Sequence, residues 1–343
     1  MLQFDFPIIF VRNESNFQNI LVIDFGQLGD VVLSLPALKA VREKFPDAKI
    51  TLFAGKSPAQ FAGISGLADE VITVDRVELR DGPRIVSIRE VFRIVGDVRS
   101  RRFDLVIDLH SLSETNLLGF LSGARHRLYA NRENRSLDYL GRFPSKPPAE
   151  DKSMHLTDRY LDVLKPLGIE DAPRFVEIAP PAGDVDEIEK LYRELGLEGK
   201  KLIGLFLGAG HPSRRWSIDN FAGLTKRLLQ NDEWRVLVFL GPEEFHLLDE
   251  VNEKFPPEAI ILDKLKLLPL FAALSLLDVL VSNDTGPMHL AAIAGTRIVL
   301  IWDKRGNPIF MPLTEKLTLV DSGTIEEIQV DAVYDAVALS INN

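Results

Sequence analysis

The chain has 343 residues, a net charge of −10, 46% hydrophobic residues and no cysteine. This length and hydrophobic content fit about two folded domains and exclude a disordered chain. The missing cysteines exclude disulfides and thiolate chemistry, the six histidines never fall at short metal-ligand spacing, and the acidic balance argues against nucleic acid as a partner.

Neither a membrane span nor a signal peptide is expected. Every apolar run falls short of the roughly 20 residues that cross a bilayer. Residues 1–7 lack the basic-then-apolar order of a secretory signal. The sequence therefore predicts a cytoplasmic protein.

The first half alternates short apolar runs with amphipathic stretches. Buried strands are expected at residues 20–25, 50–54, 70–74, 105–109 and 126–129. Helical patterns lie between most of them, notably at 31–44 and 84–99. Strands that alternate with helices predict a parallel sheet built from βαβ units.

The pattern starts again at Lys201. Further strands are expected at residues 202–207, 235–240, 259–262, 279–282 and 297–301. Helices are expected at 218–230, 243–254, 267–276 and 287–294, and a final helix at about 325–339. The second half thus repeats the architecture of the first without repeating its sequence.

We therefore expect an α/β protein of two doubly wound domains, residues 1–170 and 185–324. Their boundary should fall within residues 166–186, where prolines and glycines interrupt every period. The carboxyl ends of both sets of strands would then face one cleft. By fold analogy, the last segment, 325–343, is expected to cross back to the first domain.

Each half opens with a strand, a glycine-bearing loop and a helix. Neither loop matches the dinucleotide fingerprint, and no Walker A sequence exists. In the first loop, Asp30 follows Gly29 at the start of a helix. Asp30 either caps this helix or faces the cleft as a general base that removes a proton from an attacking hydroxyl.

The second loop, residues 208–216, adds cations directly after a strand. The planar fork of Arg214 and the hydroxyl of Ser213 suit phosphate oxygens at a helix N-terminus. Alternatively, Arg214 and Arg215 are solvated charges and Trp216 belongs to the core. The position between a parallel strand and a helix favours the phosphate interpretation.

Two further segments follow strands of the second half. In residues 281–289, Asp284 or Thr285 is either a ligand or an ordinary helix N-cap, and His289 lies one turn into the helix. After the strand at 235–240, Glu244 either accepts hydrogen bonds from both ribose hydroxyls or complements the helix dipole.

Five segments in this order resemble glycosyltransferase family 9, the heptosyltransferases of lipopolysaccharide core synthesis. They are residues 26–38, 103–109, 208–222, 240–244 and 283–292, and the similarity runs from about Asn19 to the C-terminus. The resemblance implies a GT-B fold of two facing Rossmann-like domains with parallel sheets. The first domain would bind the acceptor, and the second would bind the nucleotide sugar.

The resemblance also implies an activity and a set of site residues. The activity is inverting transfer of heptose from ADP-heptose to a Kdo or heptose of the inner core. Asp30 becomes the catalytic base, and Glu244 becomes the ribose contact. The diphosphate and sugar site comprises Ser213, Arg214, Asp284, Thr285, Gly286 and His289. No Asp-x-Asp pair stands at a donor strand end, so neither a metal nor another cofactor is expected.

A lipid-linked anionic acceptor requires cations on the first domain. The candidates for acceptor binding are Gly29 together with Arg125, Arg127, Arg132 and Arg135 from a basic stretch at residues 123–146. Arg99, Arg101 and Arg102 form a second basic cluster. These stretches are either solvated loops or a surface for the acceptor and for the inner face of the cytoplasmic membrane.

The chain departs from the family pattern in four places. Arg214 stands where lysine is common, and Asp24 stands where the first strand commonly carries arginine. Residues 1–18 precede the usual start, and residues 303–308 lack the customary Gly-Pro-Thr-Asp stretch. The remaining alternatives are another GT-B enzyme, either a different sugar transferase or an epimerase, and a non-catalytic nucleotide-sugar-binding relic.

Overall fold

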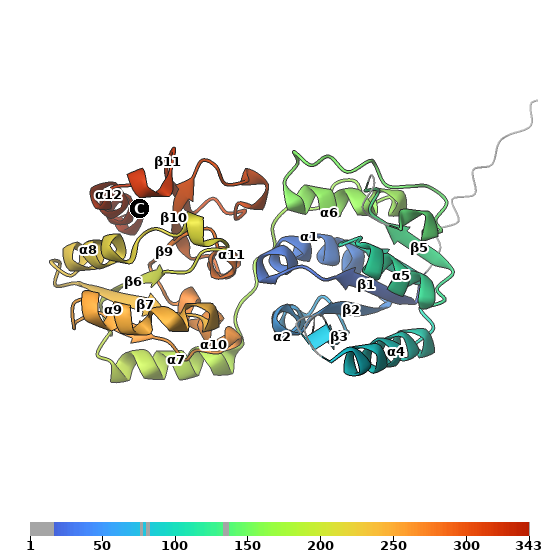
Figure 1. Cartoon of the computed structure of the whole chain (residues 1–343), viewed down its shortest axis with the longest axis horizontal. Coiled ribbons are helices and arrows are strands. Elements are labelled where there is room, and N and C mark those ends of the chain that lie inside the picture. The colour runs from blue at the N-terminus through green and yellow to red at the C-terminus, as the bar shows by residue number, and fades with distance from the viewer. Residues whose placement is uncertain (1–16, 76–77, 80–82, 133–136, 343) are drawn as a thin grey trace, which may run out of the picture.

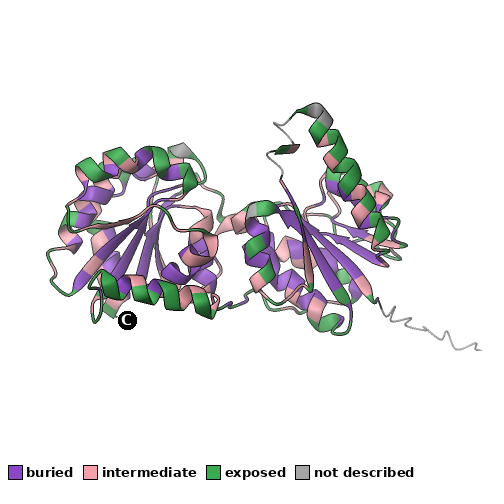
Figure 2. Cartoon of the chain, turned by 90° about the horizontal axis from the view of Figure 1, so that it is seen from below, coloured by how far each residue is buried: buried purple, intermediate pink, exposed green. Residues whose placement is uncertain are grey.

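The computed structural model describes residues 17–75, 78–79, 83–132 and 137–342. It contains two parallel-sheet α/β domains that lie side by side (Figure 1). The strands form the buried interior of each domain, and helices cover them with outward faces exposed (Figure 2). This is the layered arrangement that alternating strands and helices predict.

The first domain is built on a five-stranded sheet in the order β3-β2-β1-β4-β5, with every pairing parallel. Its strands are β1 (Asn19–Asp24), β2 (Lys49–Gly55), β3 (Glu70–Val74), β4 (Leu105–Asp108) and β5 (His126–Tyr129). Ile20 in β1 pairs with Ile50 in β2 and with Leu105 in β4. The continuous apolar character of β1 follows from this central position, because helices cover both of its faces.

Helices of the first domain divide between the two faces of the sheet. One face packs α1 (Leu28–Lys44), α2 (Lys56–Ile64) and α6 (Leu156–Leu164). The other face packs α4 (Arg84–Ser100) and α5 (Ser113–Leu121). Short 3-10 turns, η1 (Asp138–Leu140) and η2 (Lys165–Leu167), follow β5 and α6.

The second domain is built on a six-stranded parallel sheet in the order β11-β10-β9-β6-β7-β8. Its strands are β6 (Lys201–Phe206), β7 (Trp234–Phe239), β8 (Ile260–Leu262), β9 (Val279–Ser282), β10 (Arg297–Asp303) and β11 (Leu317–Ser322). The sequence did not predict β11. It is an edge strand of half-buried and exposed residues and lacks the apolar run of a central strand.

Helices also cover both faces of the second sheet. One face packs α7 (Ala182–Glu194), α10 (Leu267–Ser275) and α11 (Gly286–Ile293). The other packs α8 (Ile218–Leu228), α9 (Leu248–Lys254) and α12 (Val330–Asn342). The remaining 3-10 turns are η3 (Pro212–Arg214), η4 (Pro242–Leu247), η5 (Pro308–Phe310) and η6 (Ile325–Glu327).

The last helix does not take the course expected from fold analogy. Residues 325–343 were expected to cross back to the first domain, but α12 packs against α8, β10 and β11 of the second domain (Figure 1). Val333 and Val337 are fully buried in the apolar cluster that these elements share. Burial of this apolar face keeps the helix on its own domain.

The two domains meet through helices that belong to one continuous apolar cluster. Helix α1 packs against α11, and α2 packs against α10. At the second contact the rings of Phe61 and Phe271 lie edge to face, with centroids 5.1 Å apart. The domains are therefore in direct contact beside the loops that follow their central strands.

Candidate active site

Each sheet has one switch point, a pair of neighbouring strands from which the chain adds further strands in opposite directions. In the first sheet this switch lies between β1 and β4, because α1 and α5 cover opposite faces. In the second it lies between β6 and β9, because α8 and α11 do the same. Open α/β sheets bind ligands outside the carboxyl strand ends at such points. The four loops after these strands therefore form the candidate site.

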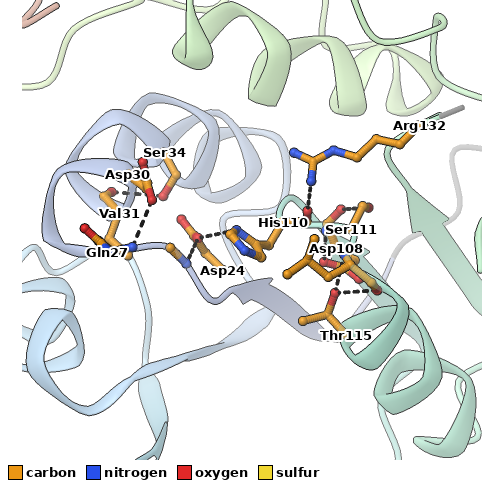
Figure 3. Close-up of polar contacts among 12 residues, drawn as sticks. Asp24, Gln27, Asp30, Val31, Ser34, Asp108, His110, Ser111, Thr115 and Arg132 are labelled. Atoms are coloured by element: carbon orange, nitrogen blue, oxygen red, sulfur yellow. Dashed lines mark hydrogen bonds and ion pairs between the residues drawn. The ribbon is translucent and has the colours of Figure 1, made fainter. Parts of the chain in front are cut away.

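The loop after β1 brings two carboxylates to either side of Gly26. A methyl group at Gly26 would lie 2.3 Å from Cβ of Asp30 and 3.0 Å from Oδ1 of Asp24. Asp30 also caps α1, since its Oδ2 accepts a hydrogen bond of 2.9 Å from the amide of Gln27 (Figure 3). The capping interpretation of Asp30 is thus confirmed, while its role as a base remains a prediction.

The loops of the two domains touch at Gly29. A Cβ at this position would lie 2.8 Å from Cδ2 of His289, and one at Gly286 would lie 3.3 Å from Cδ2 of Leu28. His289 is 4% exposed, and burial lowers its pKa to about 4, so that the ring is neutral near pH 7. Glycine at position 29 is what allows the start of α1 to approach the start of α11.

In the second domain, an ion pair joins the loops after β6 and β9. Nη1 of Arg214 lies 2.7 Å from Oδ2 of Asp284, and the amide of Gly210 donates to the Asp284 carbonyl at 2.8 Å. Burial raises the pKa of Asp284, and Arg214 acts in the opposite direction. Ser213 stays exposed beside this pair. Arg214 is therefore not the isolated solvated charge that one interpretation of the sequence suggested.

Helix α11 begins at this place without a side-chain cap. Thr285 occupies the N-cap position in an extended conformation, and its side chain makes no capping hydrogen bond. The capping interpretation of the sequence is therefore confirmed for the position of Thr285 but not for its side chain. The N-terminus of a helix carries a partial positive charge that favours anions.

Glu244 lies beneath the loop after β6. Its side chain is buried, and Oε2 accepts a hydrogen bond of 3.1 Å from the amide of Gly241. A Cβ at Gly208 would lie 2.3 Å from Oε1 of Glu244, so only glycine leaves room for this carboxylate. Burial raises the pKa of Glu244, and the neighbouring charge of Glu243 adds to this effect.

Sequence reasoning did not assign the role that Asn283 has in the structure. Its fully buried amide donates to the carbonyls of Leu207 and Gly208 and accepts from the amide of Trp216 at 3.0 Å. The asparagine therefore ties the loop after β6 to the loop after β9. Trp216 is fully buried against Phe221, which confirms the core interpretation of that residue.

The predicted acceptor arginines do not gather into one free basic patch. Arg127 donates to the carbonyls of Leu140 and Ala124. Arg132 donates to the carbonyl of His110 and pairs with Glu150 at 3.0 Å. Arg125 is exposed, and Arg135 lies outside the described residues. At least two arginines of the basic stretch, Arg127 and Arg132, thus make contacts within the protein that hold the loop after β5.

Among residues 17–75, 78–79, 83–132 and 137–342, no three His, Asp or Glu side chains are grouped as they would be around a metal ion. In the same part of the chain, no helix is both long and apolar enough to cross a membrane.

The two parallel-sheet α/β domains form a GT-B fold, and the family match shows that the protein is a glycosyltransferase. The chain belongs to glycosyltransferase family 9 (heptosyltransferase), whose family model matches residues 91–333. This confirms the family and the fold that the sequence motifs indicated.

Individual relatives are distant in sequence but similar over nearly their full length. Lipopolysaccharide heptosyltransferase 3 of Escherichia coli is 23% identical, over 88% of this chain and 87% of that protein. A solved family 9 glycosyltransferase from Veillonella parvula superposes with a TM-score of 0.83 at 24% identity, over 96% of this chain and 98% of that one. An E. coli heptosyltransferase solved with ADP has a TM-score of 0.74 at 18% identity, over 94% of this chain and 100% of that one.

Proposed function

We propose that this protein transfers heptose from ADP-heptose to a Kdo or heptose unit of the lipopolysaccharide inner core, with inversion at the anomeric carbon. The observation that carries the proposal is the contact between Gly29 and His289. It brings the loop of the proposed base, Asp30, against the loop of the proposed diphosphate site. The relatives support the substrate class, because E. coli lipopolysaccharide heptosyltransferase 3 aligns with most of the chain.

The second domain offers a coherent site for the donor. Thr285, Gly286 and the first turn of α11 would hold the diphosphate, together with Ser213 and the fork of Arg214. His289, one turn further, would face the sugar. The buried carboxylate of Glu244 would accept the ribose hydroxyls. The choice of ADP is supported by the related E. coli heptosyltransferase that was solved with ADP.

The reaction would be a single displacement. Asp30 removes the proton from the acceptor hydroxyl as its oxygen forms a bond to the anomeric carbon. The bond from that carbon to the diphosphate oxygen breaks at the same time, and ADP leaves from the opposite face of the sugar. The N-terminus of α11 and Arg214 stabilise the negative charge that develops on the leaving diphosphate.

Calorimetric titration with ADP, UDP and GDP tests the donor assignment. We expect ADP to bind most tightly, and Arg214→Gln to weaken ADP binding on the order of tenfold, because one charge-assisted contact to phosphate is lost. Arg193→Gln, on the exposed face of α7, is the matched control and should bind ADP normally. Equal affinity for the three nucleotides, or an unchanged affinity in Arg214→Gln, would argue against the proposed donor site.

The proposal includes contact with the inner face of the cytoplasmic membrane, where a lipid-linked acceptor resides. Helix α4 supports it, because four of its apolar side chains are exposed: Val86, Ile88, Val91 and Phe92. Phe92 is 73% exposed. Arg89, Arg93 and Arg99 are exposed on the same helix. Apolar side chains interleaved with arginines are typical of a helix that lies in an anionic membrane surface.

Co-sedimentation with vesicles tests this docking surface. The protein should sediment with vesicles that contain anionic phospholipid and much less with purely zwitterionic ones, and Phe92→Asp should lower the bound fraction severalfold. Leu195→Asp, at an exposed apolar position in the second domain, serves as the control and should bind like the parent. If both variants bind anionic vesicles like the parent, α4 is not the docking surface.

A further inference from the structure

A histidine and a buried carboxylate meet at the switch point of the first sheet. Asp24, the last residue of β1, is 0% exposed, and its Oδ1 accepts a hydrogen bond of 2.8 Å from the amide of Gly26. His110 follows β4, and its Nδ1 lies 3.7 Å from the same oxygen (Figure 3). This separation is that of an ion pair. Because β1 and β4 are neighbours, the pair stands where the sheet is expected to bind its ligand.

The backbone that carries His110 is held in an unusual conformation. Ser111 has φ of 45°, in the left-handed region that residues other than glycine rarely adopt. Asp108 holds it there, because its Oδ1 accepts from the Ser111 amide and its carbonyl accepts from Oγ, both at 2.7 Å. The guanidinium of Arg132 donates to the His110 carbonyl (Figure 3). A strained backbone conformation that surrounding hydrogen bonds hold in place, as at Ser111, is often found at functional sites.

The carboxylate of Asp24 beside the His110 ring favours the cationic form of that ring. The Asp24 carboxylate is excluded from water, so its attraction for a proton on His110 is weakly screened. Arg132 donates to the His110 carbonyl and, like Arg159, pairs with Glu150, so the carboxylate of Glu150 offsets the charge of these two nearby cations. The side chain of His110 is 17% exposed, so one edge of the ring can reach a ligand while the other faces Asp24.

We propose that His110, held protonated by Asp24, binds an anionic group of the acceptor, a carboxylate or a phosphate, and so determines acceptor specificity. The inference rests on the proposed function, which supplies an anionic saccharide as acceptor. The imidazolium donates a hydrogen bond to the anion and leaves the acceptor hydroxyl to Asp30. Asp24 is then a positioning residue, because it acts on the acceptor through His110.

Other ionisable groups face this pair and contribute to any dependence on pH. Asp30 from α1 and Arg159 from α6 lie close enough, with Asp24 and Arg132, to influence the buried Tyr160. Asp108 lies in β4, and burial raises its pKa to about 7, against hydrogen bonds from Ser111 and Asn116. The contribution of His110 is therefore obtained by comparing the pH dependence of kcat/KM in the parent with that in its variants.

The test compares two soluble acceptors, a Kdo-terminated saccharide and the same saccharide with its carboxyl groups reduced to alcohols. With ADP-heptose as donor, the parent should prefer the carboxylate acceptor by about tenfold in kcat/KM, the effect of one charge-assisted hydrogen bond. His110→Gln should lose this preference through acceptor KM, with kcat and ADP affinity little changed. In the parent, this preference should decline at high pH as the His110 imidazolium loses its proton. His110→Arg should restore the preference and keep it at high pH, because the guanidinium stays charged. Asp24→Asn should weaken it most at high pH.

His126→Gln is the matched control, because His126 lies at the amino end of β5, whereas His110 follows the carboxyl end of the neighbouring parallel strand β4. Transfer to neither acceptor by the parent would contradict the proposed function itself. Equal transfer to both acceptors, with turnover intact, would overturn only the role of His110. A fall in kcat at unchanged acceptor KM in His110→Gln would also overturn it and would make His110 a proton acceptor instead.

Discussion

Asp30→Asn is expected to lower kcat for heptose transfer by on the order of 10²- to 10⁴-fold, because the amide cannot accept the proton of the acceptor hydroxyl. The same substitution should leave ADP affinity within about twofold, since the proposed nucleotide site lies on the other domain. The measurement pairs steady-state turnover with calorimetric titration of ADP on the same preparation.

Asparagine is chosen because Asp30 also caps α1. The Oδ2 atom accepts the amide proton of Gln27, and an asparagine oxygen can do the same. Asp30→Ala would remove both functions and add a stability cost of about 1 kcal/mol. Asp47→Asn, at an exposed turn of the same domain, is the control and should turn over normally. Turnover of Asp30→Asn close to that of the parent would exclude Asp30 as the base.

Gly29→Ala is expected to disrupt the contact between the two domains. The added methyl group would lie 2.8 Å from Cδ2 of His289, which is buried and has little room to move. We expect a loss of about 1–3 kcal/mol in the free energy of unfolding, typical of overpacking. Turnover should fall on the order of 100-fold, because the proposed base and leaving group shift relative to one another. Chemical denaturation and steady-state kinetics measure the two effects.

Two comparisons separate this clash from a general effect of alanine. Gly96 lies within α4 with nothing inside 4 Å of an added Cβ, so Gly96→Ala should be neutral or stabilising by about 0.5–1 kcal/mol. In the double variant Gly29→Ala with His289→Ala, the methyl group gains space and part of the lost stability should return. If Gly29→Ala unfolds and turns over like the parent, the two loops do not meet as this structure has them.

Hydropathy alone predicted most of the sheet structure. Ten strands were expected close to their observed places, because central parallel strands are continuous apolar runs. The edge strand β11 was missed because it alternates between half-buried and exposed residues. The boundary segment was expected to be irregular, yet it ends in α7, a helix that buries only Ile188 and Tyr192. Weak apolar stripes of this kind are hard to separate from loops.

The residues of the candidate site could be proposed from the sequence, but their contacts with one another could not. Motif spacing singled out Asp30, Glu244 and Arg214, yet no sequence pattern states that Gly29 touches His289 or that Gly208 makes room for Glu244. Those contacts depend on how the two domains and their loops pack. The basic stretch was misjudged for a related reason: nothing in the sequence shows that Arg127 donates to the carbonyl of Leu140, or that Arg132 donates to the carbonyl of His110 in the loop after β4.

Analysis of the reaction product is the most direct test of the proposed heptose transfer with inversion. The protein is incubated with ADP-heptose and a Kdo-terminated acceptor, and the product is examined by mass spectrometry and by NMR of its anomeric signal. We expect one added heptose, release of ADP, an anomeric configuration opposite to that of the donor, and loss of the product with Asp30→Asn. An unchanged acceptor, a product of retained configuration, or transfer from a UDP- or GDP-sugar in preference to ADP-heptose would contradict it.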